Sequence, residues 1–176
     1  VDRNGERELF ADLGGSPNGL AFQDDGSLWV CNGGGRWAPE RSTGGTSGPG
    51  DSPSVVQRVR PDGAVDIVVA EIDGVALSAP NDVCFGPGGG LWFTDPAWPL
   101  DDGIAPPGAV CWTSADGLAR RVHVSLAFPN GVAVAIDDEM LDAMNSVPTT
   151  GSERSNGSVR SSATAAEWKS PVSTTR

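Results

Sequence analysis

Asparagine follows proline at three places in this chain, and each pair stands at the head of an alternating apolar segment. An asparagine side chain offers a neutral carbonyl oxygen, which is one of the ligand types that calcium takes in proteins. The same side chain also bonds readily to its own backbone in turns. The residues alone leave open both a cation site and three ordinary turns. The pairs are Pro17-Asn18, Pro80-Asn81 and Pro129-Asn130.

The three pairs begin copies of one pattern, in which two apolar segments flank an acidic or glycine-rich turn. Apolar residues that alternate with period two predict β-strands, and a turn with glycine between two of them predicts a hairpin. The copies begin 63 and 49 residues apart, which indicates a repeat architecture. They read PNGLAFQDDGSLWVCN from Pro17, PNDVCFGPGGGLWFTD from Pro80 and PNGVAVAIDDEML from Pro129.

Two further strands are expected after each of the first two hairpins, over residues 54–72 and 108–124. Four strands in series make one blade of a β-propeller. The fold class that follows is all-β, a partial propeller of about two and a half blades over residues 1–145. Residues 146–176 carry few apolar anchors, and we expect an irregular or disordered tail there.

The residues before the first copy and after the third copy depart from the repeated pattern. Residues Arg7 to Leu13 resemble the last strand of a preceding blade. In the third copy, Asp142 stands where the earlier copies have Trp29 and Trp92, and the strand pattern is expected to stop after Leu141. Because so few blades cannot close a ring, the outer strands would present unpaired edges, which leaves an oligomer open.

Charge and composition exclude several classes of partner. The 24 glycines and 14 prolines among 176 residues favour many short strands over a helical bundle. The net charge of −11 argues against nucleic acid and anionic membranes, because both bind basic surfaces. No segment approaches the roughly 18 apolar residues that a membrane span needs. We therefore expect no nucleic-acid or membrane partner.

The cysteines and the single histidine offer no catalytic set. Cys31, Cys84 and Cys111 lack metal-ligand spacing, so we expect reduced, mostly buried thiols and a cytoplasmic protein. His123 lies in an alternating apolar segment, and we assign it a structural or surface role.

The ordered series of motifs between about Asn4 and Leu141 resembles the senescence-marker-protein (SMP-30)/gluconolactonase family of regucalcin-like, six-bladed propellers. Its most specific feature is the Pro-Asn-Asp at residues 80–82 with Thr-Asp-Pro following at 94–96. The runs that carry the resemblance are SPNGLAFQDDGSLWVCNGGGRW, VVQRVRPDG, LSAPNDVCFGPGGGLWFTDP, GAVCWTSADG and LAFPNGVAVAIDDE.

The resemblance implies one divalent cation at the mouth of a central channel, calcium or alternatively zinc. Family members hold it with a glutamate, two asparagines and an aspartate. The asparagines correspond to Asn81 and Asn130, whereas Asn18 would face the channel and contact substrate. The glutamate would precede Val1, and the aspartate, which is also the expected general base, would follow Leu141. The chain thus shows two of the four ligands and no identified catalytic residue.

The function implied is a metal-dependent hydrolase that opens a sugar-type lactone through a metal-activated water, with a small-molecule lactone as its partner. The missing ligands leave a second interpretation open, a non-catalytic truncated propeller fragment or binding module. A third is a similar propeller with other chemistry, such as phosphotriester hydrolysis or a condensation, because one fold hosts many functions.

Overall fold

The structure is a computed structural model whose described part is all-β, with short 3-10 turns such as η1 (Gly34–Trp37) between strands. The described ranges are 3–37, 52–86, 89–97, 107–134, 141–146 and 156–161, and for residues 36–37, 123, 141–146 and 156–161 they cover the backbone alone. Within these ranges no helix is long and apolar enough to cross a membrane.

The first four strands form one antiparallel sheet, sheet 1, in the order β1-β2-β3-β4. Its hairpins are those predicted, since β1 pairs with β2 across the Asp24-Asp25-Gly26 turn and β3 pairs with β4 across Pro61-Asp62-Gly63. Gly26 and Gly63 have φ angles of 82° and 84°, a region in which glycine is strongly favoured. The strands are β1 (Pro17–Phe22), β2 (Leu28–Asn32), β3 (Val55–Val59) and β4 (Val65–Val69).

The second repeat forms sheet 2, whose order β7-β8-β9-β10 reproduces that of sheet 1. A short two-stranded ribbon of β5 (Glu71–Ile72) and β6 (Val75–Ala76) lies between the two sheets in the sequence. The strands of sheet 2 are β7 (Val83–Phe85), β8 (Leu91–Asp95), β9 (Gly108–Thr113) and β10 (Ala119–Leu126).

The third repeat extends beyond the sequence prediction. Sheet 3 contains β11 (Pro129–Val134), β12 (Leu141–Ser146) and β13 (Asn156–Ser161). The expectation that the strand pattern stops after Leu141 is therefore wrong, because β12 continues for five residues and pairs with β13. The backbone ladder is satisfied on both sides of β12, which compensates for the polar Asp142. The domain boundary at residue 145 stays a prediction.

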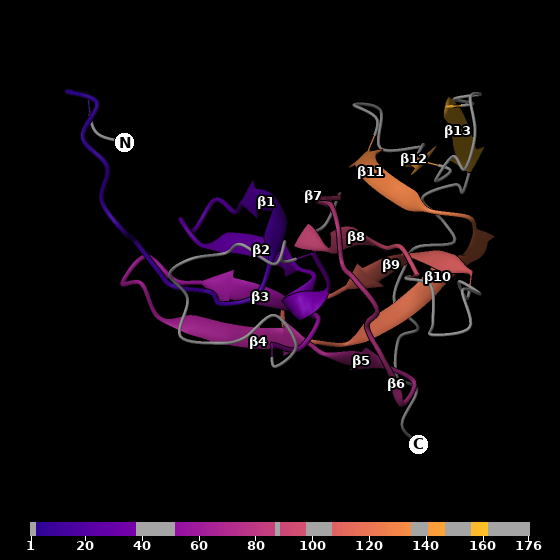
Figure 1. The fold of residues 1–176 in the computed structure, drawn as a ribbon, viewed down its shortest axis with the longest axis horizontal. Coiled ribbons are helices and arrows are strands. Elements are labelled where there is room, and N and C mark those ends of the chain that lie inside the picture. Colours follow the sequence, from indigo (N-terminus) through magenta and orange to yellow (C-terminus); the bar gives the residue numbers. More distant parts are fainter. Residues whose placement is uncertain are drawn as a thin grey trace, which may run out of the picture.

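The segment 7–13 is a second difference between expectation and structure. It forms no strand, and its C-terminal end lies against sheet 1, where the Leu13 carbonyl accepts hydrogen bonds from the Asn32 and Gln57 side chains. The N-terminal part of the chain extends away from the sheets (Figure 1). Leu9 and Phe10 are 80% and 59% exposed. A strand is stable only beside a partner that accepts its backbone hydrogen bonds. No described strand takes that place beside residues 7–13.

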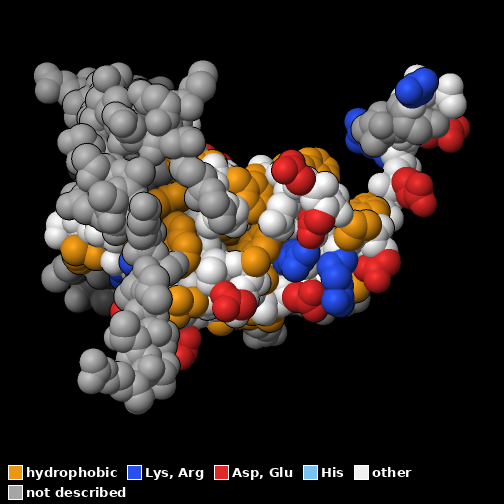
Figure 2. Space-filling view, turned by 180° about the vertical axis from the view of Figure 1, so that it is seen from behind, with side chains coloured by type: hydrophobic (Ala, Val, Ile, Leu, Met, Phe, Trp, Pro, Cys, Tyr) orange, Lys and Arg blue, Asp and Glu red, His pale blue; other side chains and the backbone are white. Residues whose placement is uncertain are grey.

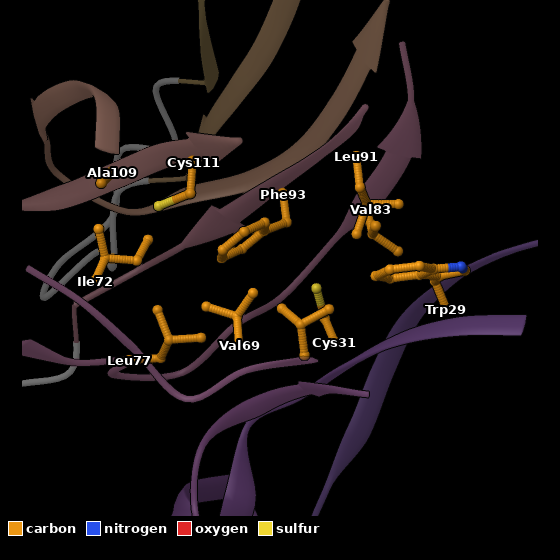
Figure 3. Packing of buried hydrophobic residues seen from close by; sticks show 11 residues of the cluster. Trp29, Cys31, Val69, Ile72, Leu77, Val83, Leu91, Phe93, Ala109 and Cys111 are labelled. Carbon is orange, nitrogen blue, oxygen red and sulfur yellow. The ribbon is translucent and has the colours of Figure 1, made fainter. Parts of the chain in front are cut away.

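Sheets 1 and 2 pack face to face around a core that both contribute (Figure 3). Trp29 and Cys31 of β2 lie on one side of it, and Phe93 and Cys111 of sheet 2 on the other. Trp29 and Phe85 meet edge to face, with their ring centroids 6.2 Å apart. The buried members are Trp29, Cys31, Val56, Val69, Ile72, Leu77, Val83, Leu91, Phe93, Ala109 and Cys111.

A second cluster joins sheet 2 to sheet 3 and repeats the arrangement of the first. In it Trp92, at the position of Trp29, packs with Val132 and Leu126. Both tryptophans are core residues, since they are 1% and 5% exposed. Hydrophobic side chains also lie at the surface among charged ones (Figure 2). The large exposed ones are Leu9, Phe10, Leu20, Phe22, Val65, Ile67, Val75, Leu118 and Val124.

Candidate metal and substrate site

The three Pro-Asn pairs all stand where the first strand of a sheet begins. Asn18 and Asn130 are the second residues of β1 and β11, and Asn81 lies two residues before β7. The strand register shifts between Pro17 and Leu20, and again between Pro129 and Val132. Such bulges leave backbone groups outside the regular ladder, where they are free to bond elsewhere.

One backbone hydrogen bond links the pairs of sheets 1 and 2. The Gly19 N–H donates to the Asn81 carbonyl oxygen over 2.7 Å. A Cβ atom at Gly19 would lie 2.5 Å from Asp82 Cα and 2.6 Å from the Asn81 oxygen. Only glycine fits this contact without a backbone shift, so Gly19 is what allows the backbones beside Asn18 and Asn81 to approach.

Thr94 of β8 links the pairs of sheets 2 and 3. Its carbonyl accepts the Asn81 N–H over 2.9 Å, and its hydroxyl donates to the Asn130 carbonyl over 2.5 Å. The Asp82 carboxylate makes a second bridge, because its Oδ2 accepts the Val132 N–H over 3.0 Å. The backbones of Asn81 and Asn130, distant in the sequence, are thus joined through one residue.

The side-chain amides of the three asparagines are not used to hold the turns. Among the interactions of the described residues, no hydrogen bond involves the amide of Asn18, Asn81 or Asn130. Asn81 is 5% exposed, Asn130 is half-buried and Asn18 is exposed. The alternative of three ordinary turn-capping asparagines therefore loses its main support, and the amide oxygens keep their capacity to bind a ligand.

The loops before the Pro-Asn pairs are capped by two other side chains, those of Asn32 and Asp95. They end β2 and β8, and each receives the backbone N–H two residues before an asparagine of the Pro-Asn pairs. Ser16 N–H donates to Asn32 Oδ1 over 2.9 Å, and Ala79 N–H donates to Asp95 Oδ1 over 2.8 Å. Both residues are nearly fully buried. The loops that present the asparagines are therefore fixed from the end of the second strand.

Asp95 carries further bonds that define its role. Ser78 N–H donates to both of its carboxylate oxygens, over 3.0 and 3.1 Å, and Arg121 Nη2 lies 4.0 Å from Oδ2. These bonds make Asp95 the cap of the loop at residues 78–79.

The residues present fit a divalent cation only in part. Two amide oxygens on neighbouring strand starts suit calcium, which takes 6–8 oxygens and mixes carbonyls with carboxylates and water. Among the described residues no group of three or more His, Cys, Asp and Glu could hold a metal ion. Asn81 and Asn130 would thus be two neutral ligands of a larger set. Their assignment, and that of Asn18 to substrate, stay predictions.

The three thiols, of which Cys31 and Cys111 are buried and Cys84 is partly buried, are poor nucleophiles. Burial, strengthened by the nearby Asp82 and Asp95 carboxylates, raises the pKa of Cys31 far above its ordinary value. Burial raises the pKa of Cys84 to about 11 and that of Cys111 to about 12. All three are free thiols, as expected, and the protonated form is the unreactive one.

The successive antiparallel sheets, each beginning near a Pro-Asn pair, place the chain among all-β proteins with the architecture of a partial propeller. A family model described as "SMP-30/Gluconolactonase/LRE-like region" matches residues 1–150. The chain belongs to this family, which confirms the resemblance found in the sequence.

Individual relatives agree with the family assignment. A gluconolactonase of Zymomonas mobilis subsp. mobilis (strain ATCC 31821 / ZM4 / CP4) is 28% identical over 135 residues, which are 73% of this chain and 33% of the relative. The fold matches a gluconolactonase of Xanthomonas campestris with TM-score 0.59 and 22% identity, covering 85% of this chain and 50% of that one. A putative gluconolactonase gives TM-score 0.55 and 23% identity, covering 81% and 49%. The chain spans a third to a half of the length of these proteins.

Proposed function

We propose that the chain contributes to a hydrolase that opens a sugar-type lactone with the help of a divalent cation. Membership of the family and similarity to proteins named gluconolactonase support the lactone as substrate class. The observation that carries the proposal is the link through Thr94. It brings together the backbones of two asparagines whose side-chain amides make no hydrogen bond within the described part of the chain.

The chemistry suits an ester carbonyl with an activated water. Calcium, or alternatively zinc, polarises the lactone carbonyl and lowers the pKa of bound water when it is present. Asn81 and Asn130 would supply two uncharged oxygens to it, and Asn18, on the neighbouring strand start, would orient the sugar hydroxyl groups. The product is a hydroxy acid. The residue that takes the proton is expected beyond the matching region, so none is assigned.

A second candidate function is a non-catalytic fragment or binding module of the same fold. The specific observation in its favour is the absence of a group of acidic, histidine or cysteine side chains that could hold a metal in the described part of the chain. Amide oxygens alone do not neutralise a divalent cation, so a carboxylate-free site binds it weakly.

Metal titration with thermal melting separates the two functions. A ligand that binds only the folded state stabilises it by about 2.7 kcal/mol at 100 times its Kd. We expect calcium or zinc to raise the melting temperature of the chain and to support acid release from gluconolactone. Asn81→Ala and Asn130→Ala should each abolish the shift. Asn18→Ala should keep the shift and weaken turnover at low substrate, since we place Asn18 on the substrate.

The opposite pattern would support the fragment. No change in melting temperature at millimolar metal, together with no lactone turnover, leaves the hydrolase without support for this chain. If metal still raises the melting temperature of Asn81→Ala, then Asn81 is not a metal ligand.

A further inference from the structure

A side-chain hydrogen bond recurs between successive sheets, and it points at the Pro-Asn pairs. Cys31 and Thr94 are both the fourth residue of the second strand in their sheets, β2 and β8. The Cys31 thiol donates to the Asp82 carbonyl over 3.5 Å, and the Thr94 hydroxyl donates to the Asn130 carbonyl over 2.5 Å. In both cases the acceptor belongs to the Pro-Asn-X segment of the next sheet.

Thr94 is tied to its own sheet's pair as well. Besides accepting the Asn81 N–H, it donates its backbone N–H to the Asp82 carbonyl over 3.0 Å, and its Oγ1 accepts the Asp82 N–H over 3.1 Å. Its side chain is 0% exposed. A hydroxyl has one proton to donate and lone pairs to accept with, so both capacities of Oγ1 are used here.

We propose that Thr94, assisted by the Asp82 carboxylate, is a positioning residue that fixes the separation of Asn81 and Asn130. This inference rests on the proposed function, because the separation matters only if both asparagines serve one ligand. Calcium–oxygen distances span only 2.3–2.6 Å, so small shifts between ligand-bearing loops lower affinity. Thr94 provides a hydroxyl donor at this place, whereas Cys31 provides a weaker thiol donor at the equivalent place in sheet 1.

The test is a series of substitutions at Thr94 with Thr113 as a matched control. Thr113 is also 0% exposed, but its hydroxyl donates to the neighbouring Ser114 carbonyl, within its own sheet. We expect Thr94→Val to weaken calcium binding by the 176-residue chain at least about tenfold, because the two asparagines lose their link. Thr94→Ser should bind like the wild type, and Thr94→Cys should lie between. Thr113→Val should lower the melting temperature without changing the calcium affinity.

Equal calcium affinity in Thr94→Val and the wild type would overturn the inference, and so would an equal loss in Thr113→Val. If the wild type gives no calcium response, the proposed function fails, and the positioning role is decided by NMR of the metal-free chain. Then Thr94→Val must shift the Asn130 and Val132 amide resonances and Thr113→Val must leave them in place. Unshifted resonances in Thr94→Val would overturn the inference.

Asp82 provides a second route if Thr94→Val does not fold. Asp82→Ala removes the acceptor of the Val132 N–H, whereas Asp82→Asn keeps an oxygen there. We expect faster exchange of the Val132 amide and weaker calcium binding in Asp82→Ala, with recovery of both in Asp82→Asn. Unchanged exchange and affinity in Asp82→Ala would contradict the proposed role.

Discussion

Leu20 and Val83 occupy the same position in two successive hairpins, yet Leu20 is 57% exposed and Val83 is 5% exposed. Each follows its Pro-Asn pair by two residues, and each pairs with the third residue of its second strand, Val30 and Phe93 respectively. Val83 packs on sheet 1 within the shared core. In the described part of the chain no sheet packs on the Leu20 face of sheet 1.

The repeat therefore gives each sheet two distinct faces. The third sheet obeys the same rule, since Val132 occupies the position of Val83 and packs against sheet 2 through Trp92. In sheets 2 and 3, the position equivalent to Leu20 faces the sheet that precedes it in the sequence. In sheets 1 and 2, the position of Trp29 faces the sheet that follows it in the sequence. The face of sheet 1 that carries Leu20 is thus apolar because of the repeat. It is exposed only in part, since Val30, the partner of Leu20 on β2, is 1% exposed.

This difference in environment predicts opposite results from similar truncations. Val83→Ala should lower the free energy of unfolding by about 2 kcal/mol, because two buried carbon atoms are lost and a cavity remains. Leu20→Ala should change it by less than about 0.5 kcal/mol, as exposed positions do. Urea denaturation of both variants measures the two values.

Protein concentration is the control for this pair. An equal loss for Leu20→Ala would mean that the Leu20 side chain is covered in solution. If that loss then disappears on dilution, the cover is a second copy of the chain, which would agree with the oligomer left open by the sequence.

Buried caps give a second prediction. Asp95→Ala leaves the Ser78 and Ala79 N–H groups without their acceptor, and each unpaired buried group costs about 1–3 kcal/mol. We expect a total loss of about 2–4 kcal/mol. Asp95→Asn keeps one oxygen and should lose less. Asp62→Ala is the matched control, because Asp62 also accepts a backbone N–H, from Ala64, but at an exposed turn. Thermal or urea unfolding that gives equal losses at residues 95 and 62 would contradict the capping role.

The caps also show what the sequence could have revealed. The second strands of sheets 1, 2 and 3 begin LWVCN, LWFTD and LDAMN, so their fifth residue is polar in every case, at Asn32, Asp95 and Asn145. Asn145 pairs with Pro129 just as Asn32 pairs with Pro17. Extending the alignment past the missing tryptophan would have predicted β12. The alternation of apolar residues alone does not predict β12, because Asp142 interrupts it.

The hairpins themselves were predictable because their information is local. Period-two alternation and glycine turns fix β1–β2 and β3–β4 within short stretches of chain. The contact through Gly19 was not predictable in this way, because it depends on how closely one sheet approaches the next. The same holds for Thr94, whose partners Asn81 and Asn130 lie 13 residues before and 36 residues after it. Periodicity says which residues face a neighbouring sheet, and packing decides which of them touch.

The raised thiol pKa values predict how stability depends on pH. In the unfolded chain the three cysteines ionise near their ordinary value of 9.0, whereas in the fold Cys84 stays protonated to about 11 and Cys111 to about 12. Cys31 shifts in the same direction. Above pH 9 the unfolded state thus holds fewer protons than the folded state, so the free energy of unfolding falls as pH rises. The stabilising effect is fully present below that pH.

Each buried thiol contributes a slope of about 1.4 kcal/mol per pH unit in this range. Urea unfolding at intervals between pH 8 and 10.5 should show a decline that starts near pH 9. Cys84→Ala should reduce the slope by about a third, since it removes one of three similar contributions and its position is only partly buried. Reaction with a thiol reagent in the folded state should stay slow over the same range. A free energy that is flat to pH 10.5, or thiols that react freely below pH 9, would show that the cysteines are not held in the two hydrophobic clusters between the sheets.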